Sequence, residues 1–309
     1  MLNIPYVTGS KKIFFKAFNE YTEKYNNILE LLRFPNKTEL RIMTFNVYMW
    51  NSRLKNNTFE SQLNVIEKIN PDIFILQEAL LEENDIKIDK IKNLGYSDII
   101  FSKNDKMDNG KYYGNIVFSR YKIVEHQIID ISNKEFCCEN YSCIYLKIKV
   151  NKKILHIFGT HLNVYDSTEK FRSYQLNKIF SYINNIDSEN IVLLGDLNLL
   201  NKYQIENEKL LYIKKHDELR NIETVSKAID IIINNNFIDS FDYVNKSPPF
   251  TTCCFDRRID YIFIKKNFQY KIIDTNIAIT NTSDHLPIIV DIDLSTRERE
   301  GGEGIRSKI

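Results

Sequence analysis

The hydrophobic positions of this 309-residue chain follow strand and helix periods in turn. Strand-like alternation appears in LRIMTFNV (40–47) and in DIFILQE (72–78), and helical spacing of apolar residues appears between them in FESQLNVIEKIN (59–70). Pro71 separates the helix from the second strand. This pattern predicts a β-α-β unit at the start of a folded domain.

More strands and one long helix follow in the same manner. The predicted strands cover 113–120, 122–130, 143–150, 153–160, 190–196, 258–265 and 285–294, and the predicted helix covers 167–183. A mixed set of strands and helices predicts an α/β protein in which two sheets pack between helices. We find no internal repeat and no linker, so the Asn- and Lys-rich segment 201–222 is interpreted as a surface insertion.

The two ends of the chain differ from this pattern. Aromatic residues recur at roughly helical spacing within residues 1–38 before Pro35, which predicts a helical extension packed on the domain. Residues 295–309 combine charge with glycine and lack an apolar period, which predicts a disordered tail. The folded domain is therefore expected to cover 39–294.

The bulk composition excludes several classes of protein. Lys and Arg total 42 against 41 for Asp and Glu, so the chain lacks the excess of positive charge typical of a nonspecific polyanion binder. No apolar run reaches the ~18 residues of a membrane span, and the N-terminus lacks the apolar core of a signal peptide. We expect a soluble, intracellular protein, cytoplasmic or nuclear, with a monomer favoured. The five cysteines lack CxxC spacing and are interpreted as free thiols rather than a zinc site.

Polar side chains stand where the apolar strands meet loops. In LLGDLNLL (193–200), Asp196 and Asn198 lie two positions apart, and such positions face the same way on a strand. Ligand sites in sheet proteins gather at strand ends. The full set of strand-end residues is Asn46, Glu78, His161, Asp196, Asn198, Asp260, Asp284 and His285.

This set has a coherent chemistry. Glu78, Asp284 and Asn46 offer the hard oxygen ligands that Mg²⁺ or Mn²⁺ prefers. The two histidines can donate to the oxygens of a phosphoryl group, while the carboxylate and amide of the LLGDLNLL pair can orient an attacking water. Each residue taken singly also has an ordinary explanation, since Asp and Asn favour tight turns after strands.

Seven short motifs occur in a fixed order: TFN (44–46), LQE (76–78), YYGNIVFSR (112–120), THL (160–162), GDLN (195–198), RRIDYIF (257–263) and SDH (283–285). In that order the chain resembles the endonuclease/exonuclease/phosphatase superfamily from about residue 40 to residue 294. The resemblance implies the DNase I-like fold, a four-layer α/β/β/α sandwich of two mixed sheets flanked by helices. It also implies hydrolysis of phosphoester bonds that depends on a divalent metal.

The resemblance assigns roles to individual residues. Glu78 would hold the metal with help from Asn46 and Asp284, and Asp196 would activate the attacking water, which Asn198 would steady. His161 would stabilise the charge of the transition state. His285, oriented by Asp260, would be either a general base or a cationic phosphate clamp. Substrate binding is expected at Tyr112, Asn115 and Arg258.

The substrate is less defined than the chemistry. His161 in THL differs from the Pro-Asn segment of apurinic endonucleases, and FTTCCFDRRIDY (250–261) lacks the tryptophan of inositol-polyphosphate phosphatases. SKNDKMDNGKYYG (102–114) and KKNFQYK (265–271) could supply parts of a basic, aromatic groove, which favours a nucleic-acid phosphodiester. The alternatives are a sphingomyelinase-like or other small phosphoesterase, and a catalytically silent nucleic-acid-binding module. Arg172 and Gln175 on the helix after THL could support the site, but packing of the helix surface is the favoured interpretation.

Overall fold

The computed structural model consists of two six-stranded sheets packed face to face. It describes residues 39–52, 56–164, 166, 168–201, 214–215, 217–219, 223–244, 252–253, 257–278 and 280–296. The predicted helical extension over 1–38 and most of the predicted tail lie outside these residues.

The first sheet has the strand order β11-β12-β1-β2-β4-β3. Its strands in chain order are β1 Leu40–Asn46, β2 Ile73–Leu81, β3 Asp98–Lys106, β4 Tyr112–Ser119, β11 Tyr270–Ile277 and β12 Ile288–Thr296. β1 and β2 run parallel, as the β-α-β unit predicts, and β1 pairs with β12 in the antiparallel sense.

The second sheet has the order β5-β6-β7-β8-β10-β9. Its strands are β5 Ile123–Asp130, β6 Ser142–Val150, β7 Lys153–His161, β8 Ile191–Asp196, β9 Phe237–Asp239 and β10 Asp260–Lys265. β7 and β8 are parallel, and β10 is antiparallel to β8.

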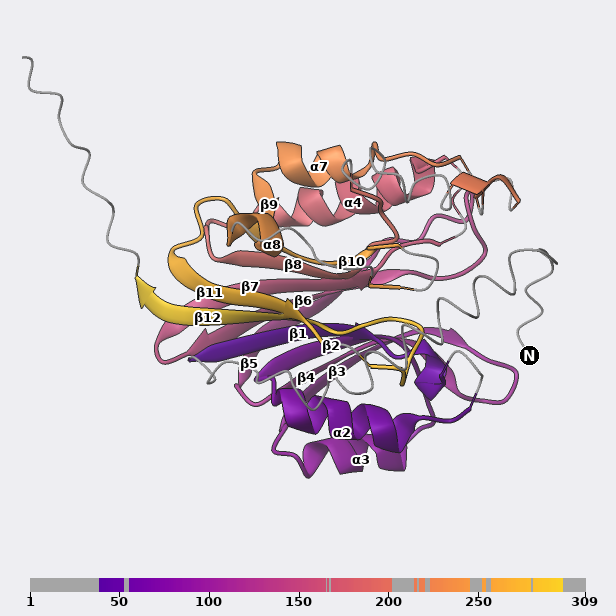
Figure 1. Ribbon diagram of the computed structural model, residues 1–309, viewed down its shortest axis with the longest axis horizontal. Helices are drawn as coiled ribbons and strands as arrows, with labels where there is room; N and C mark the ends of the chain where they lie inside the picture. The colour runs from indigo at the N-terminus through magenta and orange to yellow at the C-terminus, as the bar shows by residue number, and fades with distance from the viewer. Residues whose placement is uncertain are drawn as a thin grey trace, which may run out of the picture.

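Helices cover the outer faces of both sheets (Figure 1). The helical elements are η1 Tyr48–Trp50, α2 Phe59–Ile69, α3 Ile86–Lys92, α4 Lys170–Ile183, α7 Ile229–Asn234 and α8 Ser240–Tyr243. The α2 and α3 helices lie on the outer face of the first sheet, and α4 and α7 lie on that of the second (Figure 1).

Three apolar cores account for this layering. Residues from both sheets, such as Ile75 and Val192, fill the core between the sheets. A second core lies between the second sheet and its helices, and a third lies between the first sheet and α2 with α3. The predicted four-layer α/β sandwich is therefore confirmed.

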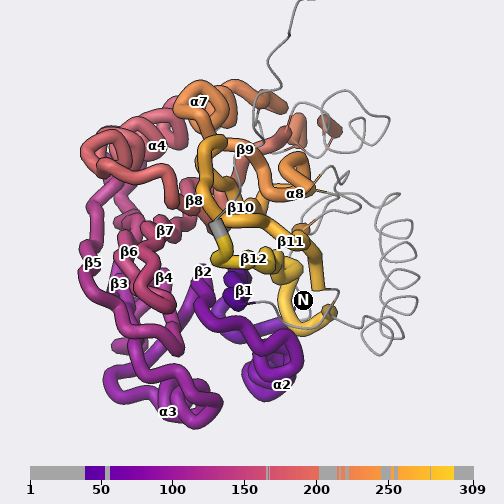
Figure 2. The backbone as a smooth tube through the Cα atoms, turned by 90° about the vertical axis from the view of Figure 1, so that its left-hand side faces the viewer, coloured from indigo at the N-terminus to yellow at the C-terminus, as the bar shows by residue number. Residues whose placement is uncertain are grey.

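The topology brings distant strand ends to one edge of the sandwich. The carboxyl ends of parallel strands meet at the same edge of a sheet, and the starts of antiparallel neighbours lie beside them. The ends of β1, β2, β7 and β8 therefore lie with the starts of β4, β10 and β12. In Figure 2 these strands lie side by side although they come from the whole length of the described chain.

Several boundaries and elements differ from the sequence-based prediction. The α4 helix begins at Lys170 rather than at 167, and β12 ends at Thr296, two residues beyond the predicted strand. The sequence analysis did not predict β3, β9, β11, α3, α7 or α8. Polar residues interrupt the apolar period in β3, and β9 and α8 are too short to show a period. None of the described helices has the combination of length and apolar character that crossing a membrane requires.

Candidate active site

The end of β8 shows why Asp196 and Asn198 come together. Gly195 has a φ of 143°, and a Cβ there would lie 1.9 Å from the carbonyl oxygen of Thr160, so only glycine permits this close pairing. The strand ends at Asp196, and Asn198 follows in the left-handed region with a φ of 50°. The backbone N–H of Asn198 donates to Oδ1 of Asp196 at 3.1 Å. A turn, rather than a continuing strand, therefore places both side chains at the same edge.

Asn46 joins the two sheets at this edge. Its Nδ2 donates to Oε1 of Glu78 and to Oδ2 of Asp196, both at 3.0 Å. Its Oδ1 accepts from the backbone N–H of Tyr48 at 3.0 Å. Asn46 thus bridges the two carboxylates and fixes their separation, a role that differs from the predicted one of presenting its oxygen to a cation.

Glu78 owes its orientation to a bulge in β2. The pairing of β2 with β4 shifts register between Leu76 and Ala79, and Glu78 between them has a φ of 56°. A bulge re-aims a side chain that regular alternation would place on the sheet face. Burial raises the pKa of Glu78, and the charge of Asp284 raises it further.

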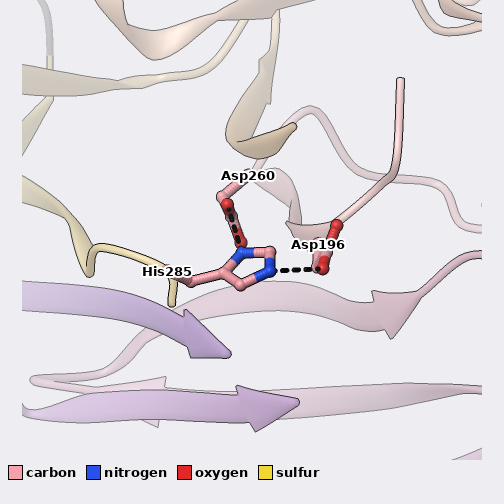
Figure 3. A group of neighbouring side chains, drawn as sticks. All are labelled: Asp196, Asp260 and His285. Carbon is pink, nitrogen blue, oxygen red and sulfur yellow. Dashed lines mark hydrogen bonds and ion pairs between the residues drawn. The ribbon is translucent and has the colours of Figure 1, made fainter. Parts of the chain in front are cut away.

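Asp260, His285 and Asp196 form a buried row (Figure 3). Nδ1 of His285 lies 2.9 Å from Oδ2 of Asp260, and its Nε2 lies 3.6 Å from Oδ2 of Asp196. Burial alone would lower the pKa of His285, but the facing Asp260, Cys253 and Asp196 outweigh it and raise the pKa well above its usual value. The ring is therefore an imidazolium at neutral pH.

His161 and Asp196 complete the centre. Nε2 of His161 lies 3.5 Å from Oδ2 of Asp196. Burial lowers the pKa of His161, so this second ring is neutral at pH 7. Burial, followed by the charge of Asp260, raises the pKa of Asp196 to about 7. The edge therefore holds one cationic ring, one neutral ring and a carboxyl group that titrates near neutrality.

These groups open into a cleft of about 630 Å³. Six of the eight strand-end residues line it: Glu78, His161, Asp196, Asn198, Asp284 and His285. Asn46 and Asp260 are fully buried behind them. Every predicted catalytic and metal-binding residue therefore lies in the cleft or directly supports a residue that does.

Two of the predicted substrate-binding residues lie elsewhere. Tyr112 lies under Lys103, whose Nζ is 4.5 Å from the ring centroid, and the cleft is lined instead by Tyr113 and Asn115. Alternation along β4 puts Tyr113 and Asn115 on one face and Tyr112 on the other. The prediction for Asn115 agrees with this placement, whereas Tyr113 was missed although strand alternation with Asn115 would have indicated it.

Arg258 is also outside the cleft. Its guanidinium binds both carboxylate oxygens of Asp239 and stacks between Phe241 and Tyr261, leaving 1% of the residue exposed. Its neighbour Arg257 lines the cleft and forms an ion pair with Asp217. The proposed contact of Arg258 with substrate is therefore wrong, because a buried bidentate ion pair occupies the guanidinium.

The α4 helix supports the site from behind. Nη1 of Arg172 donates to the carbonyl oxygen of Asn163 at 3.0 Å, and the N–H of Asn163 donates to Oε1 of Gln175 at 2.9 Å. The preceding carbonyl, of Leu162, accepts from Nδ2 of Asn198 at 3.0 Å. Both helix residues are buried, so their interpretation as surface packing is wrong: they hold the backbone that orients Asn198.

The donor chemistry identifies where a cation fits. Among the described His, Cys, Asp and Glu side chains, the group of three whose ligand atoms lie within 4.8 Å of one another is Asp196, Asp260 and His285. A protonated imidazole has no lone pair for a metal, which makes this trio a poor binding site. Glu78 and Asp284 both line the cleft, and the charge of Asp284 raises the pKa of Glu78, a repulsion that a hard cation would relieve. These residues therefore fit a divalent cation.

The arrangement defines a protein of the DNase I-like class, and solved structures agree. An endonuclease/exonuclease/phosphatase from Beutenbergia cavernae superposes with a TM-score of 0.64 at 18% identity, covering 83% of this chain and 72% of that chain. The human Nocturnin catalytic domain gives a TM-score of 0.62 at 20% identity, covering 84% and 93%. At these identities the similarity concerns the fold.

Sequence comparison identifies the family. The profile of the Endonuclease/Exonuclease/phosphatase family matches residues 43–285, so the chain belongs to this family. Sphingomyelinase C of Bacillus cereus is 30% identical over 206 residues, which cover 54% of this chain. The match spans 59% of that relative's length.

Proposed function

We propose that the protein is a phosphodiesterase, dependent on Mg²⁺ or Mn²⁺, whose substrate is a phospholipid or other small phosphodiester with a cationic head group. The observation that carries the chemistry is the row Asp260, His285 and Asp196 beside the Glu78 carboxylate. The observations that support the substrate are the acidic lining of the cleft and the similarity to a sphingomyelinase.

The residues have different roles in an in-line displacement, in which the oxygen of a water molecule bonds to phosphorus while the P–O bond to the leaving group breaks. Asp196, whose pKa is about 7, accepts the proton of the attacking water. Asn198 steadies that water with its amide oxygen, because its Nδ2 is held by Leu162. The His285 imidazolium, kept charged by Asp260, donates to the phosphoryl oxygens, and the neutral His161 ring adds a second donor.

Glu78 and Asp284 are the residues that would hold the cation. A bound divalent ion supplies charge neutralisation and polarises a phosphoryl oxygen. Asn46 contributes by holding the Glu78 carboxylate in place. The charge of Glu78 acts on the neighbouring His161 ring and opposes the lowering of its pKa by burial, which connects the proposed cation-binding carboxylate with the catalytic row.

The charge of the cleft favours a single phosphodiester with a cationic group. Arg172 and Arg257 are the two arginines among the described lining residues, and no lysine is among them. The lining acids are Glu78, Asp105, Glu139, Glu169, Asp196, Asp217, Glu223 and Asp284. A quaternary ammonium head group, such as that of sphingomyelin, is attracted by carboxylates and by aromatic faces such as those of Tyr113 and Tyr141.

Nucleic acid, the substrate class favoured by the sequence, has less support. A strand carries a phosphate at every nucleotide, and those flanking the scissile bond would meet the acidic lining. The lysines expected to form a basic groove are partly neutralised, because Lys103 pairs with Glu83 and Lys111 pairs with Glu82.

A substrate panel tests the proposal. Purified protein is assayed with bis-p-nitrophenyl phosphate, sphingomyelin in mixed micelles, and labelled RNA and single- and double-stranded DNA, each with Mg²⁺ and with EDTA. We expect EDTA-sensitive hydrolysis of the first two, with sphingomyelin cleaved faster than any nucleic acid. Faster cleavage of DNA or RNA would overturn the substrate, and no hydrolysis of any phosphodiester would overturn the proposed function.

A further inference from the structure

Tyr113 occupies a distinctive position at the edge of the cleft. It lies near the start of β4 and pairs with Leu80 of β2, directly beside the bulge that aims Glu78. Alternation along the strand directs Tyr113 and Asn115 to the cleft, and both line it. The sequence motifs did not assign a role to Tyr113.

Tyr113 lines the cleft, and several other lining residues act electrostatically on its hydroxyl group. Burial raises its pKa well above 10, and the charges of Glu78, Tyr141, Asp196 and Glu139 raise it further. The proton therefore stays on the oxygen throughout the pH range in which a phosphodiesterase operates, which makes this group a donor.

No described protein group accepts that proton. The neighbouring Tyr141 hydroxyl donates to Oε2 of Glu139 at 2.5 Å and accepts from Nδ2 of Asn163 at 2.7 Å. Among the described residues, Tyr113 has no comparable partner, although its ring is largely buried in a wall of the site. A polar group placed in this way is satisfied when a ligand oxygen enters the cleft.

We propose that the Tyr113 hydroxyl is a catalytic residue that donates a hydrogen bond to a non-bridging oxygen of the substrate's phosphoryl group. This inference rests on the proposed phosphodiesterase function. It adds a neutral donor to the two histidines and places it on β4 of the first sheet, whereas Asp196 and Asp260 come from the second sheet and His285 from the segment before β12. The phosphoryl group is then held from both sheets, and the hydrogen bond strengthens as negative charge develops on its oxygens.

The adjacent tyrosine provides a matched control. Tyr113→Phe removes one oxygen atom and keeps the ring, and Tyr112→Phe makes the same change on the opposite face of β4, where the ring lies under Lys103. With bis-p-nitrophenyl phosphate and saturating Mg²⁺, we expect Tyr113→Phe to lower kcat/KM by about 10- to 100-fold, mainly through kcat. Tyr112→Phe should stay within about twofold of the wild type.

The proposed contact can also be tested without catalytic activity, by calorimetric measurement of the binding of inorganic phosphate in the presence of Mg²⁺. Weaker binding by Tyr113→Phe than by Tyr112→Phe supports the contact even if the wild type hydrolyses no phosphodiester, an outcome that overturns the proposed function alone. Equal phosphate affinity in both variants overturns the contact. So does a kcat/KM for Tyr113→Phe within about twofold of an active wild type.

Discussion

Nδ1 of His285 lies 2.9 Å from Oδ2 of Asp260, and this contact determines the charge of the ring. Burial would by itself lower the pKa of His285, but the carboxylate reverses the direction and raises it. The same carboxylate orients the ring so that Nε2 faces Asp196 across 3.6 Å. A single hydrogen bond therefore sets both the protonation and the direction of the group that meets the substrate.

Replacement of the orienting carboxylate should impair catalysis more at higher pH. In Asp260→Asn the imidazolium loses its main partner and its pKa falls, so we expect kcat/KM to drop at least about 100-fold at pH 8 and less at pH 6. The pH dependence of kcat/KM is the measurement, and Asp187→Asn, at an exposed position, is the control. An equal loss at both pH values would contradict the proposed role.

The fall of kcat/KM at low pH should report the protonation of Asp196. Its pKa is raised to about 7, so the group is protonated and unable to accept a proton below that pH. We expect log kcat/KM to rise with a slope of about one up to pH ~7 and then to level off. A rate that is independent of pH from about 5 to 8 would show that Asp196 is not the base.

Metal binding should be visible as a gain in stability that depends on Glu78. Ligands that bind the native state raise its unfolding free energy by about 2.7 kcal/mol at 100 times Kd. We expect Mg²⁺ to raise the Tm of the wild type and of the control Glu83→Gln, whose exposed carboxylate pairs with Lys103, but not that of Glu78→Gln. An equal Mg²⁺-induced shift in all three proteins would place the cation elsewhere.

The same variant tests the cost of burying the Glu78 carboxylate. Because its pKa is raised on folding, the native state binds the proton more tightly, and stability falls as pH rises through the pKa of the folded state. We therefore expect metal-free Glu78→Gln to unfold at or above the Tm of the wild type at pH 8. A markedly lower Tm would show that the carboxylate is needed for folding.

The two adjacent arginines should separate stability from function. Arg258→Met leaves the Asp239 carboxylate buried without its partner, and we expect a loss of about 3–5 kcal/mol in the free energy of unfolding. Arg257→Met changes a side chain that lines the cleft and should change KM, whereas Arg258→Met should leave the KM of the folded protein unchanged. Denaturant unfolding and steady-state kinetics on both variants distinguish these outcomes. A changed KM in the folded Arg258→Met variant would contradict the assignment of Arg258 as structural.

Much of the site was predictable because polarity at strand ends has few structural explanations. Asn46 and Asp196 each end an apolar strand, Glu78 lies in the bulge near the end of β2, and the topology brings these positions to one edge. The sequence pattern does not predict the local backbone conformation. The bulge that turns Glu78 and the left-handed turn at Asn198 are set by pairing with neighbouring strands.

Errors arose where adjacent residues face opposite ways. Tyr112 and Tyr113 share a motif, as do Arg257 and Arg258. In each pair the sequence analysis selected one residue, and it is the other one that lines the cleft. Strand alternation would have resolved the tyrosines, since Asn115 was already expected in the site. The buried position of Arg258 depends on its ion pair with Asp239. Asp239 lies on β9, which is too short to show a hydrophobic period in the sequence.

Non-additivity between Asp196 and His285 tests the central claim most directly. The claim is that these two side chains act as a single hydrolytic unit on a phosphodiester, although Asp196 ends β8 of the second sheet and His285 precedes β12 of the first. The measurement is kcat/KM for bis-p-nitrophenyl phosphate in the wild type, Asp196→Asn, His285→Asn and the double variant. We predict that each single change costs about 10²- to 10⁴-fold and that the double variant is scarcely worse than the poorer single one. Losses that multiply in the double variant, or single variants with wild-type rates, would contradict the account.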